Sequence, residues 1–376
     1  MGRLEEFNTA VSQRRYSEEE VRSAIRNMIV DGCEIQPGHD VLILNENGVT
    51  EPIIADMIED ECRKLGARVF VMWADTVTGP EDIPETLVRA FERPDVTIFN
   101  HMIAGLMRMV PMEGRGLKML NFLQTWNSMG SAFGQVPYRI WLETLKHLVP
   151  AITSAKSWRI TCPNGTDFSG EMKLHGHKPK GKNAGTGDGF TVRTFPLGVC
   201  PVIDSMEANG TIAVRWLTPS GIHVFEPNGV ELPDTVLVKI ENGRAVDFSG
   251  SPEAVRAMRE YLDFVGEKVG KDPYIVNSWH AGINPRCTAP EGPGAGLDRW
   301  MYMAHANPRI VHLHTVGEAQ PGEMSVPVLD ATIEFDGKKL WEGGRLVALD
   351  DPALREQVKS FGDLDFAFHH EQDIGV

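Results

Sequence analysis

The chain has 376 residues, 42% of them hydrophobic and 24% charged, a composition typical of a folded globular protein with room for two domains. Its 52 acidic and 37 basic residues give a formal net charge of -15. Because this charge repels nucleic-acid phosphates and anionic membrane surfaces, we expect neither as a partner. The five cysteines form no CxxC pair, which argues against a disulfide framework and a zinc ribbon.

The amino terminus has no signal-peptide core, and no apolar run approaches the roughly 20 residues that cross a bilayer. We therefore predict a cytoplasmic protein. We expect a small-molecule substrate as its partner, and a symmetric homo-oligomer as its assembly, since such oligomers are common.

The first 150 residues alternate strand-like and helical patterns. Ser17 and Glu20 form a capping box that begins the first helix. Short apolar runs are typical of parallel strands covered on both faces, and they occur at 41–44, 69–72 and 96–99. Helical segments at 51–65 and 84–91 separate them, a strand follows at 117–122, and a helix at 136–148. The order βαβαβ predicts a three-layer α/β domain with a parallel sheet over residues 1–150.

Residues 151–376 are richer in glycine, proline and β-branched residues, which predicts a β-rich α+β domain. Four dipeptides are typical of tight turns: Asn209-Gly210, Asn228-Gly229, Asn242-Gly243 and Asp336-Gly337. Helices are expected at 252–269 and 296–305. The glycine- and lysine-rich stretch 176–189 is a candidate mobile loop.

Several segments of the second half occur in the order seen in one known family. They are 158–167, 195–201, 207–212, 281–285 and 326–330. Over roughly residues 150–345 the chain resembles the thermophilic-type metalloaminopeptidases and the iron-dependent 2,5-dihydroxypyridine 5,6-dioxygenases. The resemblance implies a thermophilic metalloprotease-like fold and a metal-dependent enzyme. Val328 stands where the family has a metal-binding histidine, and Val199 where it has a carboxylate. These departures require replacement ligands if a metal is bound.

Four residues are candidate metal ligands. His312 and His314 lie two apart in a strand-like run, so that their side chains share one face of the strand. His280 precedes a glycine turn, and Asp330 ends an apolar run. Two imidazoles and one carboxylate would form a facial ligand set for ferrous iron. The alternatives are histidines that line a polar surface or make structural hydrogen bonds, and a carboxylate that caps a turn.

Other residues are candidates for proton transfer and substrate binding. His101 follows a predicted parallel strand, at the sheet edge where α/β proteins bind ligands, and Glu207 begins a β segment; we expect either one to move protons. Trp279 suits a flat aromatic substrate. His175 and His177 lie at the start of the glycine-rich stretch and could add a metal ligand or clamp the substrate. Structural roles in the core, a turn and a solvated loop are the alternatives.

Three functions therefore stay open. The first is oxidative ring cleavage of a small aromatic or heteroaromatic compound by a non-haem Fe(II) dioxygenase, as the resemblance to the dihydroxypyridine dioxygenases implies. The second is an aminopeptidase or amide hydrolase with one or two divalent ions, as the aminopeptidase relatives imply; Zn and Mn are the alternatives to iron. The third is a binding protein on the same fold with no metal.

Overall fold

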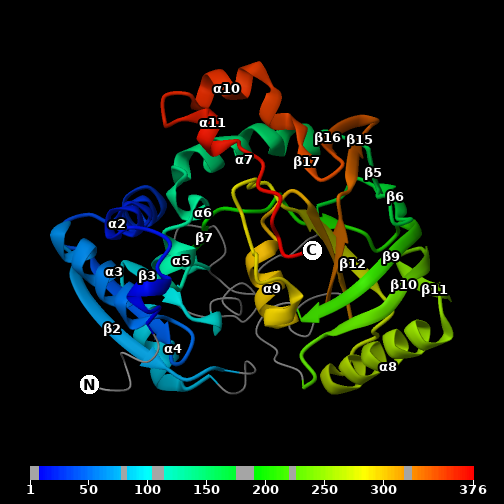
Figure 1. The fold of residues 1–376 in the computed structure, drawn as a ribbon, viewed down its shortest axis with the longest axis horizontal. Coiled ribbons are helices and arrows are strands. Elements are labelled where there is room, and N and C mark those ends of the chain that lie inside the picture. Colours follow the sequence, from blue (N-terminus) through cyan, green and yellow to red (C-terminus); the bar gives the residue numbers. More distant parts are fainter. Residues whose placement is uncertain (1–7, 78–82, 104–113, 175–189, 220–225, 317–323) are drawn as a thin grey trace. The chain divides into compact units, whose positions relative to one another are not determined.

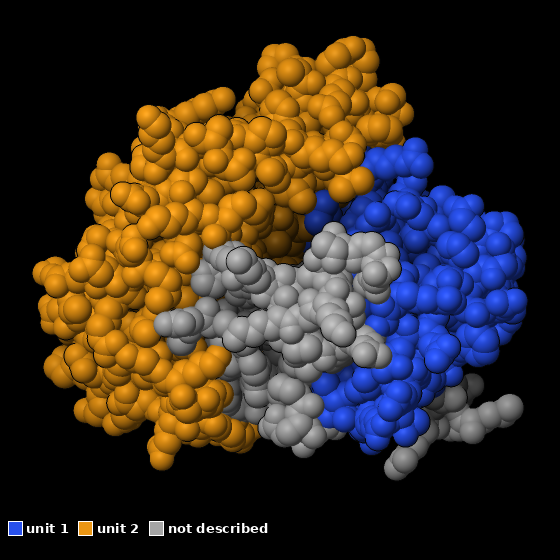
Figure 2. Space-filling model, turned by 180° about the vertical axis from the view of Figure 1, so that it is seen from behind, with its two compact units in different colours: residues 1–140, 178–197 blue, residues 141–177, 198–376 orange. Residues whose placement is uncertain are grey.

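The computed structural model describes residues 8–77, 83–103, 114–174, 190–219, 226–316 and 324–376. The chain forms two compact units, one of Met1–Ile140 with Lys178–Leu197 and the other of Trp141–His177 with Gly198–Val376 (Figure 2). The domain boundary at 150/151 stays a prediction, because compactness alone does not define an independently folding domain. None of the helices in the described ranges is long and apolar enough to span a membrane.

Unit 1 contains a five-stranded sheet in the order β2-β1-β3-β4-β7, and every neighbouring pair is parallel (Figure 1). The strands are β1 (Asp40–Glu46), β2 (Arg68–Ala74), β3 (Val96–Asn100), β4 (Gly116–Asn121) and β7 (Phe190–Phe195). The predicted parallel α/β sheet is confirmed. One detail differs: β2 is an edge strand, and 55% of Phe70 is exposed, so this strand is not covered on both faces.

The predicted helices of unit 1 begin within two residues of their expected starts. Ser17 caps α2 (Glu18–Arg26) through a complete capping box with Glu20. The main crossover helices are α3 (Pro52–Lys64) and α4 (Glu85–Glu92); shorter elements are η1 (Val11–Gln13), the π-helix η2 (Asn27–Gly32), α5 (Trp126–Met129) and α6 (Ala132–Gln135). Helix α7 (Tyr138–Thr153) crosses the boundary between the units and continues past its predicted end, with Pro150 inside it.

Unit 2 is built on a large antiparallel sheet in the order β17-β16-β15-β5-β6-β9-β14-β13-β12-β8, with β10 and β11 branching from β9 (Figure 1). Its strands are β5 (Ser157–Thr161), β6 (Asp167–Glu171), β8 (Ile203–Asp204), β9 (Asn209–Pro219), β10 (Val230–Glu241), β11 (Arg244–Ser249), β12 (Val276–Ala281), β13 (Ile310–Thr315), β14 (Met324–Leu329), β15 (Thr332–Phe335), β16 (Lys338–Glu342) and β17 (Arg345–Leu346). The β-rich second half is confirmed.

The helical elements of unit 2 include both predicted helices, α8 (Pro252–Val269) and α9 (Leu297–Ala304). Smaller elements are η5 (Pro293–Ala295), η6 (Val347–Asp350), α10 (Pro352–Val358) and α11 (Leu364–Ala367). The predicted turns at Asn242-Gly243 and Asp336-Gly337 connect β10 to β11 and β15 to β16, with positive φ at both residues of each pair.

The turn expected at Asn209-Gly210 is wrong, because these residues begin strand β9. A Cβ on Gly210 would lie only 2.1 Å from the carbonyl oxygen of Asp167 on the paired strand β6. The glycine is therefore required by close approach of two strands rather than by chain reversal.

Candidate metal centre

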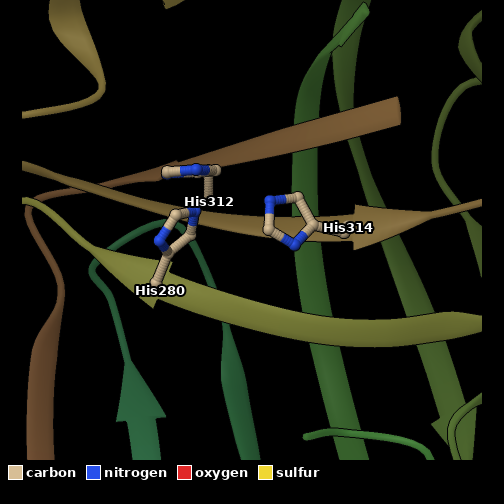
Figure 3. A group of neighbouring side chains, drawn as sticks. All are labelled: His280, His312 and His314. Atoms are coloured by element: carbon tan, nitrogen blue, oxygen red, sulfur yellow. The ribbon is translucent and has the colours of Figure 1, made fainter. Parts of the chain in front are cut away.

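Strands β12 and β13 bring three histidines to one place. The strands pair antiparallel with His280 opposite His312 and Ser278 opposite His314. Because side chains alternate between the faces of a strand, His280 lies on the same sheet face as His312 and His314. Figure 3 shows the three rings gathered over the two strands.

The three imidazoles are close enough to share one ion. The ring centroid of His280 lies 3.9 Å from that of His312 and 5.0 Å from that of His314, and those of His312 and His314 are 5.1 Å apart. One ligand nitrogen of each ring lies within 4.8 Å of the other two. Two metal–nitrogen bonds of about 2.1 Å span roughly 4 Å, so this spacing suits a single ion.

Burial keeps His312 neutral. His312 and His314 are 5% and 4% exposed, whereas His280 is partly exposed. Burial lowers the pKa of His312 well below its ordinary value, and the nearby imidazoles of His280, His314 and His305 lower it further. A neutral imidazole is the form that binds a metal.

One ring nitrogen of His312 lacks a partner. Its Nδ1 is buried, and among the described residues it makes no hydrogen bond. An unsatisfied buried polar atom costs about 1–3 kcal/mol, and a cation or an ordered water would remove that cost. This orphaned nitrogen, together with three imidazole donors, fits a transition-metal ion such as Fe, Zn, Cu or Ni.

A fourth imidazole lies beside the group. His305 follows the last residue of α9, and its Nδ1 lies 2.9 Å from the carbonyl oxygen of Tyr302. The rings of His305 and His312 meet edge to face with centroids 5.7 Å apart. His305 is not one of the three residues whose ligand atoms lie within mutual reach, so it borders the group without completing it. The sequence offered one signal, since the helix predicted at 296–305 ends on this histidine.

The structure places Asp330 apart from the histidines. Strand β14 ends at Leu329, and Asp330 adopts a φ of 52° that turns the chain. Its carboxylate accepts two hydrogen bonds from Arg309, at 2.7 and 2.9 Å. Asp330 is not one of the residues whose ligand atoms lie within mutual reach, and its carboxylate pairs with Arg309 instead.

Trp279 and Val328 lie on the opposite face of the sheet from the histidines. Trp279 is fully buried and packs against Trp158 and Phe335, with centroids 5.2 and 6.2 Å away. It is therefore a core residue, not a wall open to substrate. Val328 pairs with Val311, while its neighbour Pro327 lies opposite His312. A histidine at position 328 would therefore point away from the group.

The two residues expected to move protons, His101 and Glu207, already have hydrogen-bond or ion-pair partners. His101 belongs to unit 1 and is 1% exposed; its Nδ1 accepts a hydrogen bond from the backbone N–H of Ile103, and its Nε2 donates to the carbonyl of Asp75. Burial lowers the pKa of His101, while the carboxylate of Glu46 opposes this shift. Glu207 lies in an exposed turn and pairs with Lys173. His175 and His177 lie outside the described residues.

Fold and site together define a two-unit α/β protein whose antiparallel sheet displays three neighbouring histidines with the donor set of a mononuclear metal centre. A solved structure, that of 2,5-dihydroxypyridine dioxygenase from Pseudomonas putida KT2440, is similar with a TM-score of 0.61. The similarity covers 90% of this chain and 98% of that chain at 16% sequence identity, which shows a shared fold. No family model and no curated protein sequence matches the chain. The resemblance to the thermophilic-type metalloaminopeptidases stays a prediction.

Proposed function

We propose that the protein is a metal-dependent oxygenase that binds one Fe(II) ion through His280, His312 and His314 and opens the ring of a small hydroxylated aromatic or heteroaromatic compound. The observation that carries the proposal is the group of three imidazoles on β12 and β13. The fold shared with a dihydroxypyridine dioxygenase supports the class of substrate. A ring-opening dioxygenation consumes one O₂ per ring and places both oxygen atoms in the product, so it needs no further reductant.

The expected facial set of two histidines and Asp330 is replaced in this proposal by three histidines. An iron ion held there would supply the redox chemistry that lets O₂ react with the ring. Three neutral imidazoles bring no negative charge, so the ion would keep its full double charge toward a substrate. Such a centre favours ligands with ionised oxygens, which hydroxylated rings provide.

The residues around the ion would have separate roles. His312 and His314 are buried and fix the centre within the sheet, whereas His280 is partly exposed and is the member of the group nearest to solvent. His101 and Glu207 have no part in the proposal, because backbone groups occupy both ring nitrogens of His101 and Lys173 pairs with Glu207.

The test is oxygen uptake by the Fe(II)-reconstituted protein. Metal-free protein is loaded anaerobically with Fe(II), its iron content is measured, and O₂ consumption is followed with a panel of dihydroxypyridines and dihydroxybenzenes. We expect about one iron per chain and substrate-dependent uptake, both lost in His312→Ala. Asp330→Asn serves as the matched control and should retain both. Iron bound equally by wild type and His312→Ala would contradict the proposal.

Metal-activated hydrolysis is the second candidate, because three histidines also form the ligand set of a catalytic zinc site with one open position. Zinc in such a site lowers the pKa of bound water to about 7. A hydrolase with two bridged metals is less suitable, since no carboxylate belongs to the group within the described residues. Zinc-dependent cleavage of amide or ester substrates without O₂ uptake would favour this candidate over the oxygenase.

A further inference from the structure

The hydroxyl of Ser278 lies between two polar side chains in the interior of unit 2. It donates a hydrogen bond to Oδ1 of Asn277 at 2.6 Å and lies 2.9 Å from Nδ1 of His314. Asn277 and Ser278 are fully buried, and His314 is 4% exposed. The three side chains form a short hydrogen-bonded chain that ends on the histidine.

The direction of this chain follows from proton counting. A serine hydroxyl has one hydrogen, and here that hydrogen is donated to the amide oxygen of Asn277. The contact with His314 must then run the other way, from an N–H at Nδ1 to the serine oxygen. The proton of the neutral imidazole is therefore on Nδ1, and Nε2 carries the lone pair.

We propose that Ser278 is a positioning residue that holds His314 in its Nδ1–H tautomer and so directs Nε2 as the donor atom for a metal ion. The proposal rests on the metal centre of the proposed function and specifies how one of its ligands is prepared.

The hydrogen bond to Ser278 would affect metal binding through the tautomer and ring orientation of His314. A ligand histidine has to present the correct nitrogen, and a hydrogen bond from its other nitrogen fixes both tautomer and ring orientation. Neutral histidine in water prefers the proton on Nε2, which would block that nitrogen. The register of β12 and β13 places Ser278 directly opposite His314, so the backbone pairing itself delivers the hydroxyl to Nδ1.

The first measurement is the tautomer of His314 in the full-length, metal-free protein. Nitrogen NMR with ¹⁵N-labelled histidine distinguishes a protonated from an unprotonated ring nitrogen, and His314→Gln assigns the signal. We expect Nδ1–H in wild type, loss of that preference in Ser278→Ala, and its return in Ser278→Thr, which keeps a hydroxyl. Ser325→Ala is the matched control, because Ser325 is buried opposite His314 on the other neighbouring strand, β14.

The second measurement is affinity for Co(II), used as an air-stable probe of the site. Ser278→Ala should bind about 10–100-fold more weakly than wild type, with Ser278→Thr and Ser325→Ala close to wild type. An unchanged tautomer in Ser278→Ala would overturn the inference even if wild type binds metal. Absence of binding by wild type would instead overturn the metal centre, while the NMR result would still decide the role of Ser278.

Discussion

Binding of a divalent ion should stabilise the protein by an amount that can be calculated. A ligand that binds only the folded state at 100 times its dissociation constant adds about 2.7 kcal/mol to the free energy of unfolding. The three candidate ligands all belong to unit 2, which has roughly 200 residues. For a unit of that size each kcal/mol raises the melting temperature by about 2–4 °C, so we expect a rise of about 5–10 °C if unit 2 unfolds alone. If all 376 residues unfold together, the rise is about 3 °C.

Scanning calorimetry of the metal-free protein, with and without Co(II), measures this shift. His312→Ala removes one of the three proposed ligands and should abolish the shift, whatever the variant does to the melting temperature without metal. Asp330→Asn should keep it in full, because Arg309 rather than the histidine group holds that carboxylate. The asparagine also tolerates the left-handed backbone at this position, where φ is 52°.

The comparison between variants tests whether the three histidines bind the ion. A wild-type protein whose melting temperature does not respond to Co(II), Fe(II) or Zn(II) has no site of the kind described. An equal shift in wild type and His312→Ala would place the bound ion elsewhere in the chain. Loss of the shift in Asp330→Asn would restore the carboxylate as a ligand.

Three further predictions concern residues outside the group of three histidines. Lys118 is fully buried, and burial lowers its pKa to about 7. The unfolded chain therefore binds more protons than the folded chain between pH 7 and the ordinary lysine pKa, so the free energy of unfolding measured in urea titrations should rise over that interval by up to about 1.4 kcal/mol per pH unit. A slope retained in Lys118→Met would refute this. Trp279→Ala should lower the free energy of unfolding by about 3–5 kcal/mol, and a near-neutral effect in the same titrations would show that Trp279 is not a core residue. Asp330→Asn should lower it by only about 1 kcal/mol or less, because the carboxylate is partly exposed; a loss of several kcal/mol would show that its pair with Arg309 anchors the fold.

Local patterns were sufficient for the main strands and helices of the first 150 residues and for helices α8 and α9. The capping box at Ser17 and Glu20 determines where α2 begins, and a few apolar residues in a row identify the buried strands β1 and β3, because these signals act within a few residues. The exposed face of β2 was missed for the opposite reason. Whether a strand lies at the edge of a sheet depends on which other strands pair with it, and among the described residues β2 pairs with β1 alone.

The same division applies to the candidate site. The sequence alone determined that His312 and His314 share a face, because the spacing of two residues in a strand requires it. Only the tertiary structure decided that His280 joins them and that Asp330 does not. His280 meets His312 through the register of two strands some thirty residues apart in the sequence. The carboxylate of Asp330 pairs with Arg309 instead, a contact that no local sequence pattern predicts. Strand pairing joins residues that are far apart in the sequence, and it determines which side chains meet.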